Sequence, residues 1–304
     1  MNFRKLISTS PPDTVWQIDQ RMAVVVHRNR RGEDRCGAAE LPPDLFEVGP
    51  VGIQAIDREQ LGAVLAPLKE RAGGGRRAAV VIPTSWVRTF LLEGEDLPRR
   101  QSDLDDVVRW RLKKLLPGAP SDIRLVAAMQ PPWGDRRQVL CITAPGRAMN
   151  DLEGAFEAIG VWPGLILPRL FALSLAPGIG EVARVVVQQE ETMLSLLVIF
   201  RSGIRLIRTK LLPTAGGALP GVEREMGLGL TYIREQLGIT ALLDCIISAA
   251  DAETNAGLTD WLNSQEGVET RGLLSDACSD PALAGLVGSA RLAPIAAVLA
   301  GGAP

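Results

Sequence analysis

The chain has 304 residues, enough for one large domain or two domains of ordinary size. Apolar residues make up 46% and charged residues 22% of it, which is typical of a soluble globular protein. The 33 Lys and Arg against 35 Asp and Glu leave a formal net charge of -2, so neither a nucleic acid nor an anionic membrane surface is expected as a partner.

The cysteines and the single histidine bear on metal binding and on compartment. No C-x-x-C pair is present, and His27 ends an apolar strand pattern. We therefore expect no zinc or other metal site, a structural histidine, and a reduced, cytoplasmic location. No signal peptide is visible before Pro11, and apolar runs such as residues 193–200 are too short to span a membrane. The four cysteines are Cys36, Cys141, Cys245 and Cys278.

The first elements predicted along the chain are a hairpin, a helix and a buried strand. Residues 13–32, DTVWQIDQRMAVVVHRNRRG, carry two apolar runs around the turn IDQR and predict a β-hairpin. Residues 30–44 are predicted to form a polar connection. Asp57 can cap a helix that Pro67 is expected to kink. Residues 78–83, AAVVIP, predict a strand that is buried on both faces.

A smaller α/β unit is predicted next. Residues 85–98 alternate as a strand, and Ser102 with Asp105 fits a capping box at a helix start. Strands at 123–129 and 138–143 and a helix ended by Gly160 follow. The helix after Ser102 is expected to bury a stripe of Leu104, Val108, Leu112 and Leu115 and to expose the cations Arg109, Arg111, Lys113 and Lys114.

The β-rich pattern then restarts. Residues 183–189, 193–200 and 204–210 predict three strands, with a turn at Ser202 and Gly203. A long helix ended by Gly238, a further strand and a further helix complete this half. The two halves are therefore predicted to be α/β units of similar plan, with an additional α/β piece inserted in the first.

This order of elements resembles the actin-like superfamily and, within it, the PilM and GspL family of type IV pilus and type II secretion assembly proteins. The resemblance is one of patterns over nearly the whole chain. It implies an α/β, actin-like (ribonuclease H-like) fold with a first lobe at 1–175, an inserted subdomain at 86–160 and a second lobe at 176–304. The second lobe is expected to be reduced, because few residues separate Gly217 from Val222, where PilM proteins carry a further subdomain. The segments that carry the resemblance are VIPTSWVRTFLL, DLDDVVRWRLKKLLPGAPSDIRLVAAM, FEAIGVWPGLILPRLFALSLA, FRSGIRLIRTKLLPTAGG, EREMGLGLTYIREQLG and ARLAPIAAVLAGGA.

The resemblance also implies three nucleotide loops, and each lacks its glycine here. Asp19 is followed by Gln20 and Arg21 in the first, Gln188 stands near the acid position of the second, and Ser248 precedes Ala249 and Ala250 in the third. Close approach of backbone N–H groups to phosphate needs those glycines. We therefore expect neither catalytic residues nor a cofactor, and ATP with Mg²⁺ is disfavoured.

Two glutamates add negative charge to the second loop. Glu190 and Glu191 would repel phosphates unless a metal joined them, and we interpret them as a solvated turn. The loop positions Asp19, Gln188 and Ser248 are thus predicted to be remnants of a site that no longer holds nucleotide.

The function that the resemblance implies is that of a non-catalytic cytoplasmic scaffold, a pseudo-ATPase in an inner-membrane pilus or secretion assembly platform. PilM proteins bind an N-terminal peptide of the membrane partner PilN, and GspL proteins dock the secretion ATPase, so either kind of partner is expected, and homodimerisation is possible. An active actin-like ATPase or kinase with a divergent site is the alternative. A membrane tether of the division-protein kind would need a basic amphipathic tail, and AAVLAGGAP carries no charge.

The partner is expected to dock where the first lobe meets the inserted piece. Tryptophan is enriched at interfaces, and Trp86, Trp110 and Trp133 all fall in or beside that piece. Core packing is the alternative for all three. The candidate partner-binding residues are Trp86, Arg88, Arg109, Trp110, Arg111 and Lys114.

Overall fold

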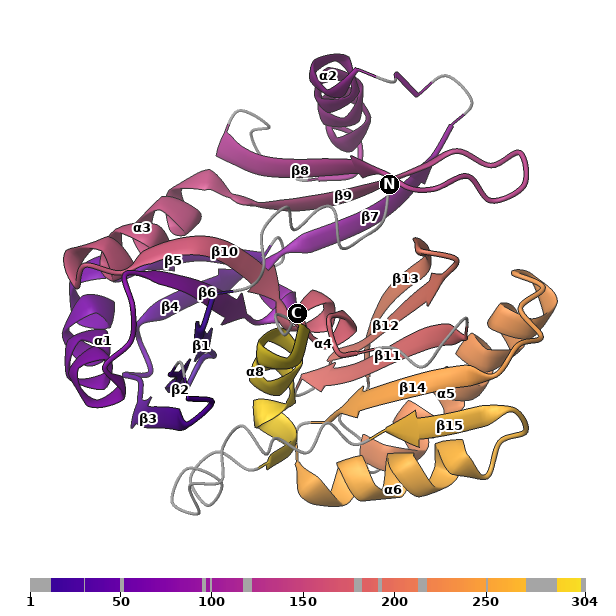
Figure 1. Ribbon diagram of the computed structural model, residues 1–304. Helices are drawn as coiled ribbons and strands as arrows, with labels where there is room; N and C mark the ends of the chain where they lie inside the picture. The colour runs from indigo at the N-terminus through magenta and orange to yellow at the C-terminus, as the bar shows by residue number, and fades with distance from the viewer. Residues whose placement is uncertain are drawn as a thin grey trace.

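The computed structural model describes residues 12–29, 31–49, 52–94, 97–98, 100–116, 122–177, 182–190, 193–212, 218–249, 251–271 and 289–301. They form two five-stranded sheets, one three-stranded sheet and one two-stranded sheet. Figure 1 shows the two large sheets side by side, with the three-stranded sheet above them. Among the described residues, no helix has the length and apolar character needed to cross a bilayer.

The first large sheet has the order β10-β6-β1-β2-β3. Strands β1, β2 and β3 form an antiparallel meander, and β6 and β10 join it in parallel. The predicted hairpin is therefore confirmed. The predicted polar connection is wrong, because residues 34–40 form an edge strand whose charged and small, mostly half-buried residues show no apolar pattern. The strands are β1 (Thr14–Ile18), β2 (Met22–Arg28), β3 (Asp34–Glu40), β6 (Arg77–Ile82) and β10 (Trp162–Pro168).

The second large sheet repeats this plan in the order β13-β12-β11-β14-β15. Again three strands form an antiparallel meander and two further strands add in parallel. The prediction of two halves with a similar plan is confirmed. The strands are β11 (Ala183–Glu190), β12 (Met193–Phe200), β13 (Gly203–Leu211), β14 (Leu243–Ser248) and β15 (Val268–Arg271).

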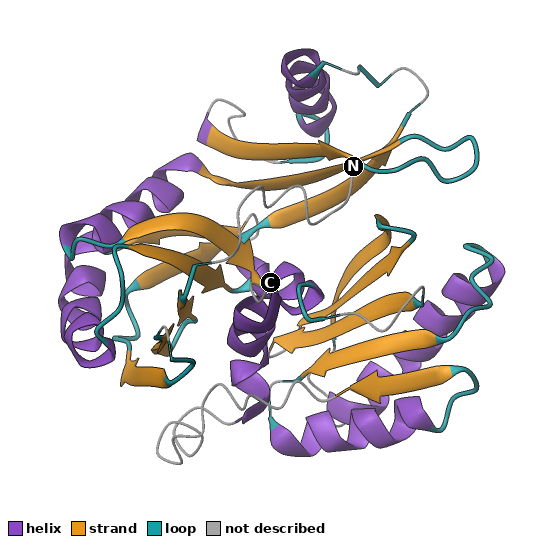
Figure 2. Cartoon of the chain, viewed as in Figure 1, coloured by secondary structure: helices purple, strands orange, loops and turns teal. Residues whose placement is uncertain are grey.

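Helices and the two large sheets alternate in layers (Figure 2). Helices α1 (Arg58–Ala72) and α3 (Gly146–Ala158) cover the outer face of the first sheet, and α5 (Ala218–Glu235) and α6 (Ala252–Asn263) cover the outer face of the second. As predicted, Asp57 caps α1 by accepting a hydrogen bond from the backbone N–H of Gln60 at 3.0 Å. Helices α4 (Arg169–Ser174) and α8 (Ser289–Gly301) lie between the sheets.

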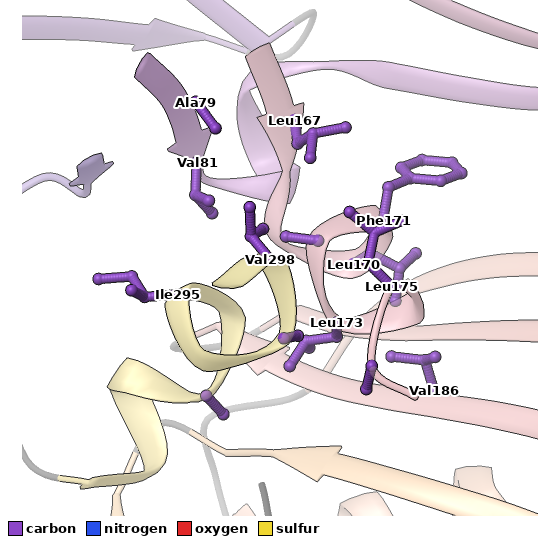
Figure 3. Close-up of a cluster of buried hydrophobic side chains, with 14 of the residues drawn as sticks. Ala79, Val81, Leu167, Leu170, Phe171, Leu173, Leu175, Val186, Ile295 and Val298 are labelled. Carbon is purple, nitrogen blue, oxygen red and sulfur yellow. The ribbon is translucent and has the colours of Figure 1, made fainter. Parts of the chain in front are cut away.

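The central layer joins both sheets through one continuous apolar cluster (Figure 3). Helix α4 contributes Leu170 and Leu173, and α8 contributes Ile295 and Val298, all of them fully buried. Because strand side chains alternate, each sheet supplies one of its faces to this layer. Residues 296–301 of the uncharged tail noted in the sequence therefore belong to a core helix rather than to an exposed amphipathic one.

The three-stranded sheet has the order β7-β9-β8 and carries helix α2 on one face. Leu104, Val108 and Leu112 are buried as predicted, but Leu115 is 53% exposed because the helix ends at Leu112. The capping box is also wrong: Arg100 is the N-cap, and the Ser102 hydroxyl donates to the Asp103 carboxylate instead. These elements are β7 (Arg88–Glu93), α2 (Gln101–Leu112), β8 (Ile123–Met129) and β9 (Gln138–Pro145).

Two small elements complete the first lobe. Strands β4 (Phe46–Gly49) and β5 (Gly52–Ile56) pair as a hairpin, and a short 3-10 helix, η2 (Thr84–Trp86), links β6 to β7.

In the second lobe, residues 212–217 connect β13 to α5, and of these 213–217 lie outside the described residues. Glu191, Gly216, Gly217 and Cys278 also lie outside them.

Truncating a side chain of the central layer should destabilise the whole protein. We expect Leu173→Ala to lower the free energy of unfolding by about 3 kcal/mol, because Leu173 is fully buried and the cavity cannot be filled from either sheet. Leu228→Ala is the matched control on a helix, since Leu228 is 48% exposed. Urea unfolding followed by tryptophan fluorescence measures both. Equal losses in the two variants would contradict the central role of this layer.

The buried thiols should be inert in the native protein. Burial raises the pKa of both Cys141 and Cys245 to about 12, so almost none of either thiol is ionised at pH 8. We expect iodoacetamide to modify the half-buried Cys36 at that pH and to leave Cys141 and Cys245 unmodified until urea is added. Peptide mass spectrometry distinguishes the sites, and native labelling of Cys141 as fast as Cys36 would contradict the expectation.

Candidate functional site

The three predicted loop positions meet at one cleft between the lobes. Asp19 follows β1, Gln188 lies near the end of β11, and Ser248 ends β14, and all three line a cleft of about 880 Å³. Equivalent strands of the two sheets end at the same place, which is why positions so far apart in sequence come together here.

The first loop is closed by the side chain of Asp19 instead of by glycine. Its Oδ1 accepts hydrogen bonds from the backbone N–H groups of Arg21 at 2.8 Å and Met22 at 2.7 Å. These are donors of the hairpin turn, the kind of group that binds phosphate in a loop of this type. The carboxylate therefore occupies donors that a nucleotide would require, while the Arg21 side chain is exposed.

The second loop places Glu190 inside the cleft, and our interpretation of it as a solvated turn residue is wrong. Its side chain is only 9% exposed. The carboxylate accepts hydrogen bonds from the backbone N–H of Thr84 at 2.9 Å and of Ser85 at 3.1 Å, and from the Gln188 amide at 2.7 Å. Three donors from both lobes thus compensate its charge, which a sequence window around the loop does not reveal.

Sequence reasoning missed Arg169 and Thr84. The Arg169 guanidinium forms an ion pair with Asp19 at 3.0 Å and lies 3.9 Å from Glu190, so it bridges the first two loops. The Thr84 hydroxyl donates to Gln188 Oε1 at 2.6 Å and accepts from the backbone N–H of Leu170 at 3.1 Å. A signal for Arg169 was present: it is the one charged residue in the apolar run GLILPRLFALSLA.

The third loop also satisfies its own backbone. The N–H of Ala249 donates to the Asn255 side chain at 3.2 Å, and Asp251 caps α6 by accepting from the N–H of Thr254 at 2.8 Å. Ser248 is buried at the cleft wall. The loop is therefore held by side chains of the helix that follows it.

The charges of the cleft compensate one another. Asp19 and Glu190 face Arg21, Arg88 and Arg169, and burial lowers the pKa of the Arg88 guanidinium. Within the described part of the chain, no cluster of three or more His, Cys, Asp or Glu side chains could hold a metal ion. The acids of the cleft are bound by backbone N–H groups and by Arg169.

The candidate partner residues at the base of the inserted sheet lie in two different environments. Trp86 is fully buried and packs on Phe46 with ring centroids 4.7 Å apart, so its side chain is part of the core and does not reach the surface. Arg88 lines the cleft between the lobes.

His27 shares a hydrogen bond with the Thr14 hydroxyl at 2.9 Å, which agrees with the structural role predicted for it.

Arg109, Trp110 and Arg111 lie on α2, on the outer side of the three-stranded sheet (Figure 1), and Lys114 lies in the turn that follows it. Arg109 donates to the Ile123 carbonyl at 3.2 Å and Arg111 to the Glu93 carbonyl at 2.9 Å, so both arginines hold the helix to the sheet. Trp110 is 60% exposed, with the Lys114 ammonium 5.2 Å from its ring centroid. The six candidates thus do not form one groove.

Comparisons with known proteins place the fold. No family model matches the chain, and no curated protein sequence matches it. Among solved structures, it is similar to a PilM–PilN type IV pilus biogenesis complex, at 15% identity over 97% of this chain and 100% of that chain, with a TM-score of 0.66.

Two further structures are similar. One is the cytoplasmic domain of EpsL, an inner membrane component of the type II secretion system of Vibrio cholerae (11% identity, 89% of this chain and 94% of that chain, TM-score 0.50). The other is a Bacteroides thetaiotaomicron protein with an actin-like ATPase fold (9% identity, 87% and 92%, TM-score 0.49). The chain therefore has the two-lobed actin-like fold that its sequence pattern predicts, and its fold is similar to those of the PilM and EpsL structures.

Proposed function

We propose that this protein is a non-catalytic scaffold of an inner-membrane pilus or secretion assembly platform. It works at the cytoplasmic face of the membrane and binds a short segment of a membrane partner. The observation that carries the proposal is the use of the cleft's N–H donors by the protein's own carboxylates. Asp19 takes the donors of the first hairpin turn, and Glu190 takes those of Thr84 and Ser85.

Phosphoryl transfer depends on positioning and on electrostatic stabilisation of a triphosphate. A triphosphate entering this cleft would meet two carboxylates at the positions where it needs donors and Mg²⁺. It would have to displace the hydrogen bonds of Glu190 and the ion pair between Asp19 and Arg169. This cost disfavours nucleotide binding and with it the alternative of an active ATPase or kinase.

The pathway part of the proposal is supported by what the similar structures are. One is a complex of PilM with PilN in type IV pilus biogenesis, and another is the cytoplasmic domain of an inner membrane component of type II secretion. With 15% and 11% identity these likenesses concern the fold, so a shared role in such an assembly is our inference.

The partner surface we propose is the outer face of α2. Trp110 is a large apolar side chain left 60% exposed, and the Lys114 ammonium, 5.2 Å from its ring centroid, places positive charge beside it. A partner segment with acidic residues beside one apolar anchor would complement this surface. The buried Trp86 has no part in it.

Calorimetry with Mg·ATP tests the non-catalytic assignment. We expect no binding heat and no phosphate release at millimolar nucleotide, because carboxylates occupy the N–H donors of the first hairpin turn and those of Thr84 and Ser85. A nucleotide-binding actin-like protein titrated in the same buffer is the control. A micromolar dissociation constant would overturn the proposal in favour of the active enzyme.

The second experiment tests the partner surface with the cytoplasmic N-terminal peptide of a candidate membrane partner. Trp110→Ala and Lys114→Glu should each weaken binding by about 10-fold or more in fluorescence anisotropy, the usual effect of losing a central anchor or reversing a charge. The melting temperature should hardly change, because both side chains are exposed.

Trp162→Ala is the matched control, since Trp162 is 65% exposed on β10, far along the chain from α2. It should bind the peptide as the wild type does. If the Trp110 and Lys114 variants bind normally, the partner docks elsewhere; if all three variants lose binding equally, the effect is not specific to α2.

A further inference from the structure

The lobes of this protein are tied together at the floor of the cleft. Glu190 belongs to β11 of the second lobe, and its carboxylate reaches the backbone N–H groups of Thr84 and Ser85 in the first lobe. Gln188, also on β11, accepts from the Thr84 hydroxyl. Since a carboxylate bound by backbone donors forms charge-assisted hydrogen bonds, this contact is stronger than ordinary polar packing.

A second tie lies outside the cleft, between the loop joining β8 to β9 and the adjoining ends of β12 and β13. Gln130 Oε1 accepts from the backbone N–H of Ile204 at 2.9 Å, and Arg205 donates to the carbonyl of Pro131 at 2.9 Å. Trp133 packs edge-on against Phe200 with centroids 5.4 Å apart, and the Arg205 guanidinium lies 4.8 Å from the Trp133 ring.

The contacts of this second tie are buried. Gln130 is 6% exposed and Arg205 is 4% exposed, so both polar groups are removed from water where the inserted sheet meets the second lobe. Figure 1 shows the same arrangement, with the β8–β9 loop reaching over the end of β12 and β13. The inserted sheet is therefore attached to both lobes and not only to the first.

The two ties lie at different places along the contact between the lobes, so separating the lobes requires breaking both. Hinge closure around a ligand depends on an open state that the ligand converts to a closed one. In this protein the contacts between the lobes are made by its own groups, and Glu190 supplies the negative charge.

We propose that the protein's own side chains lock the lobes in the arrangement described above. Glu190 acts as an internal ligand at the cleft floor, and the Gln130, Trp133 and Arg205 contacts hold the inserted sheet to the second lobe. The relative placement of the lobes is therefore independent of nucleotide. The inference concerns the two lobes alone and does not depend on which partner, if any, binds α2.

Hydrogen exchange tests the floor tie. In Glu190→Ala the amides of Thr84 and Ser85 should exchange about tenfold faster, the change expected for losing one hydrogen bond of ordinary net strength. Glu269→Ala is the matched control, because Glu269 is exposed on β15. Unchanged exchange at Thr84 and Ser85 would overturn the assignment of Glu190 as internal ligand.

Small-angle X-ray scattering tests the lock as a whole. The wild type should give the same radius of gyration with and without millimolar Mg·ATP, and the double variant Glu190→Ala with Arg205→Met should give a larger one. Glu269→Ala with Arg224→Met is the control pair, since Arg224 is exposed on α5. Compaction of the wild type by Mg·ATP, or a double variant as compact as the control pair, would overturn the proposal.

Near-ultraviolet circular dichroism first establishes that each variant is folded. Where Glu190→Ala is not, Glu190→Gln replaces it: that side chain keeps its size and one acceptor, and a smaller acceleration of exchange at the same two amides is expected. No partner peptide is present in these experiments, so their outcome is separate from that of the α2 binding test.

Discussion

The structure depends on the apolar layer that α4 and α8 form between the two large sheets. Each sheet buries one face against this layer, so neither can complete its core without the two helices. Helix α4 comes from the middle of the chain and α8 from residues 289–301, which means that the lobes share a core that closes only when distant segments meet. This shared core sets the distance between the strand ends and hence the geometry of the cleft.

The cleft keeps the form of a ligand site, but its polar groups bind one another. Asp19, Glu190 and Arg169 compensate one another's charge, and the backbone donors of the loops are occupied by carboxylates. A preserved arrangement of strands is compatible with changed chemistry, because the sheet order fixes where the loops meet while the loop side chains decide what they bind. The fold alone therefore says little about nucleotide use.

Helix α2 illustrates how a cationic helix can be structural. Arg109 and Arg111 donate to carbonyls of β8 and β7, the two edge strands of the inserted sheet. Each of these contacts binds one carbonyl at the end of an edge strand. Two of the four predicted cations are therefore engaged within the protein, while Trp110, Lys113 and Lys114 are exposed.

The sequence by itself determined most element types and the repeated plan of the halves, because strands buried on both faces leave continuous apolar runs and helices with one buried face leave periodic ones. It also located the three loops and their missing glycines. It did not reveal the edge strand β3, whose charged and small residues carry no such pattern, nor the burial of Trp86 and Glu190. Only the tertiary structure decided those burials, because the contacting groups are remote in sequence. Phe46 packs on Trp86, and the N–H groups of residues 84 and 85 bind Glu190.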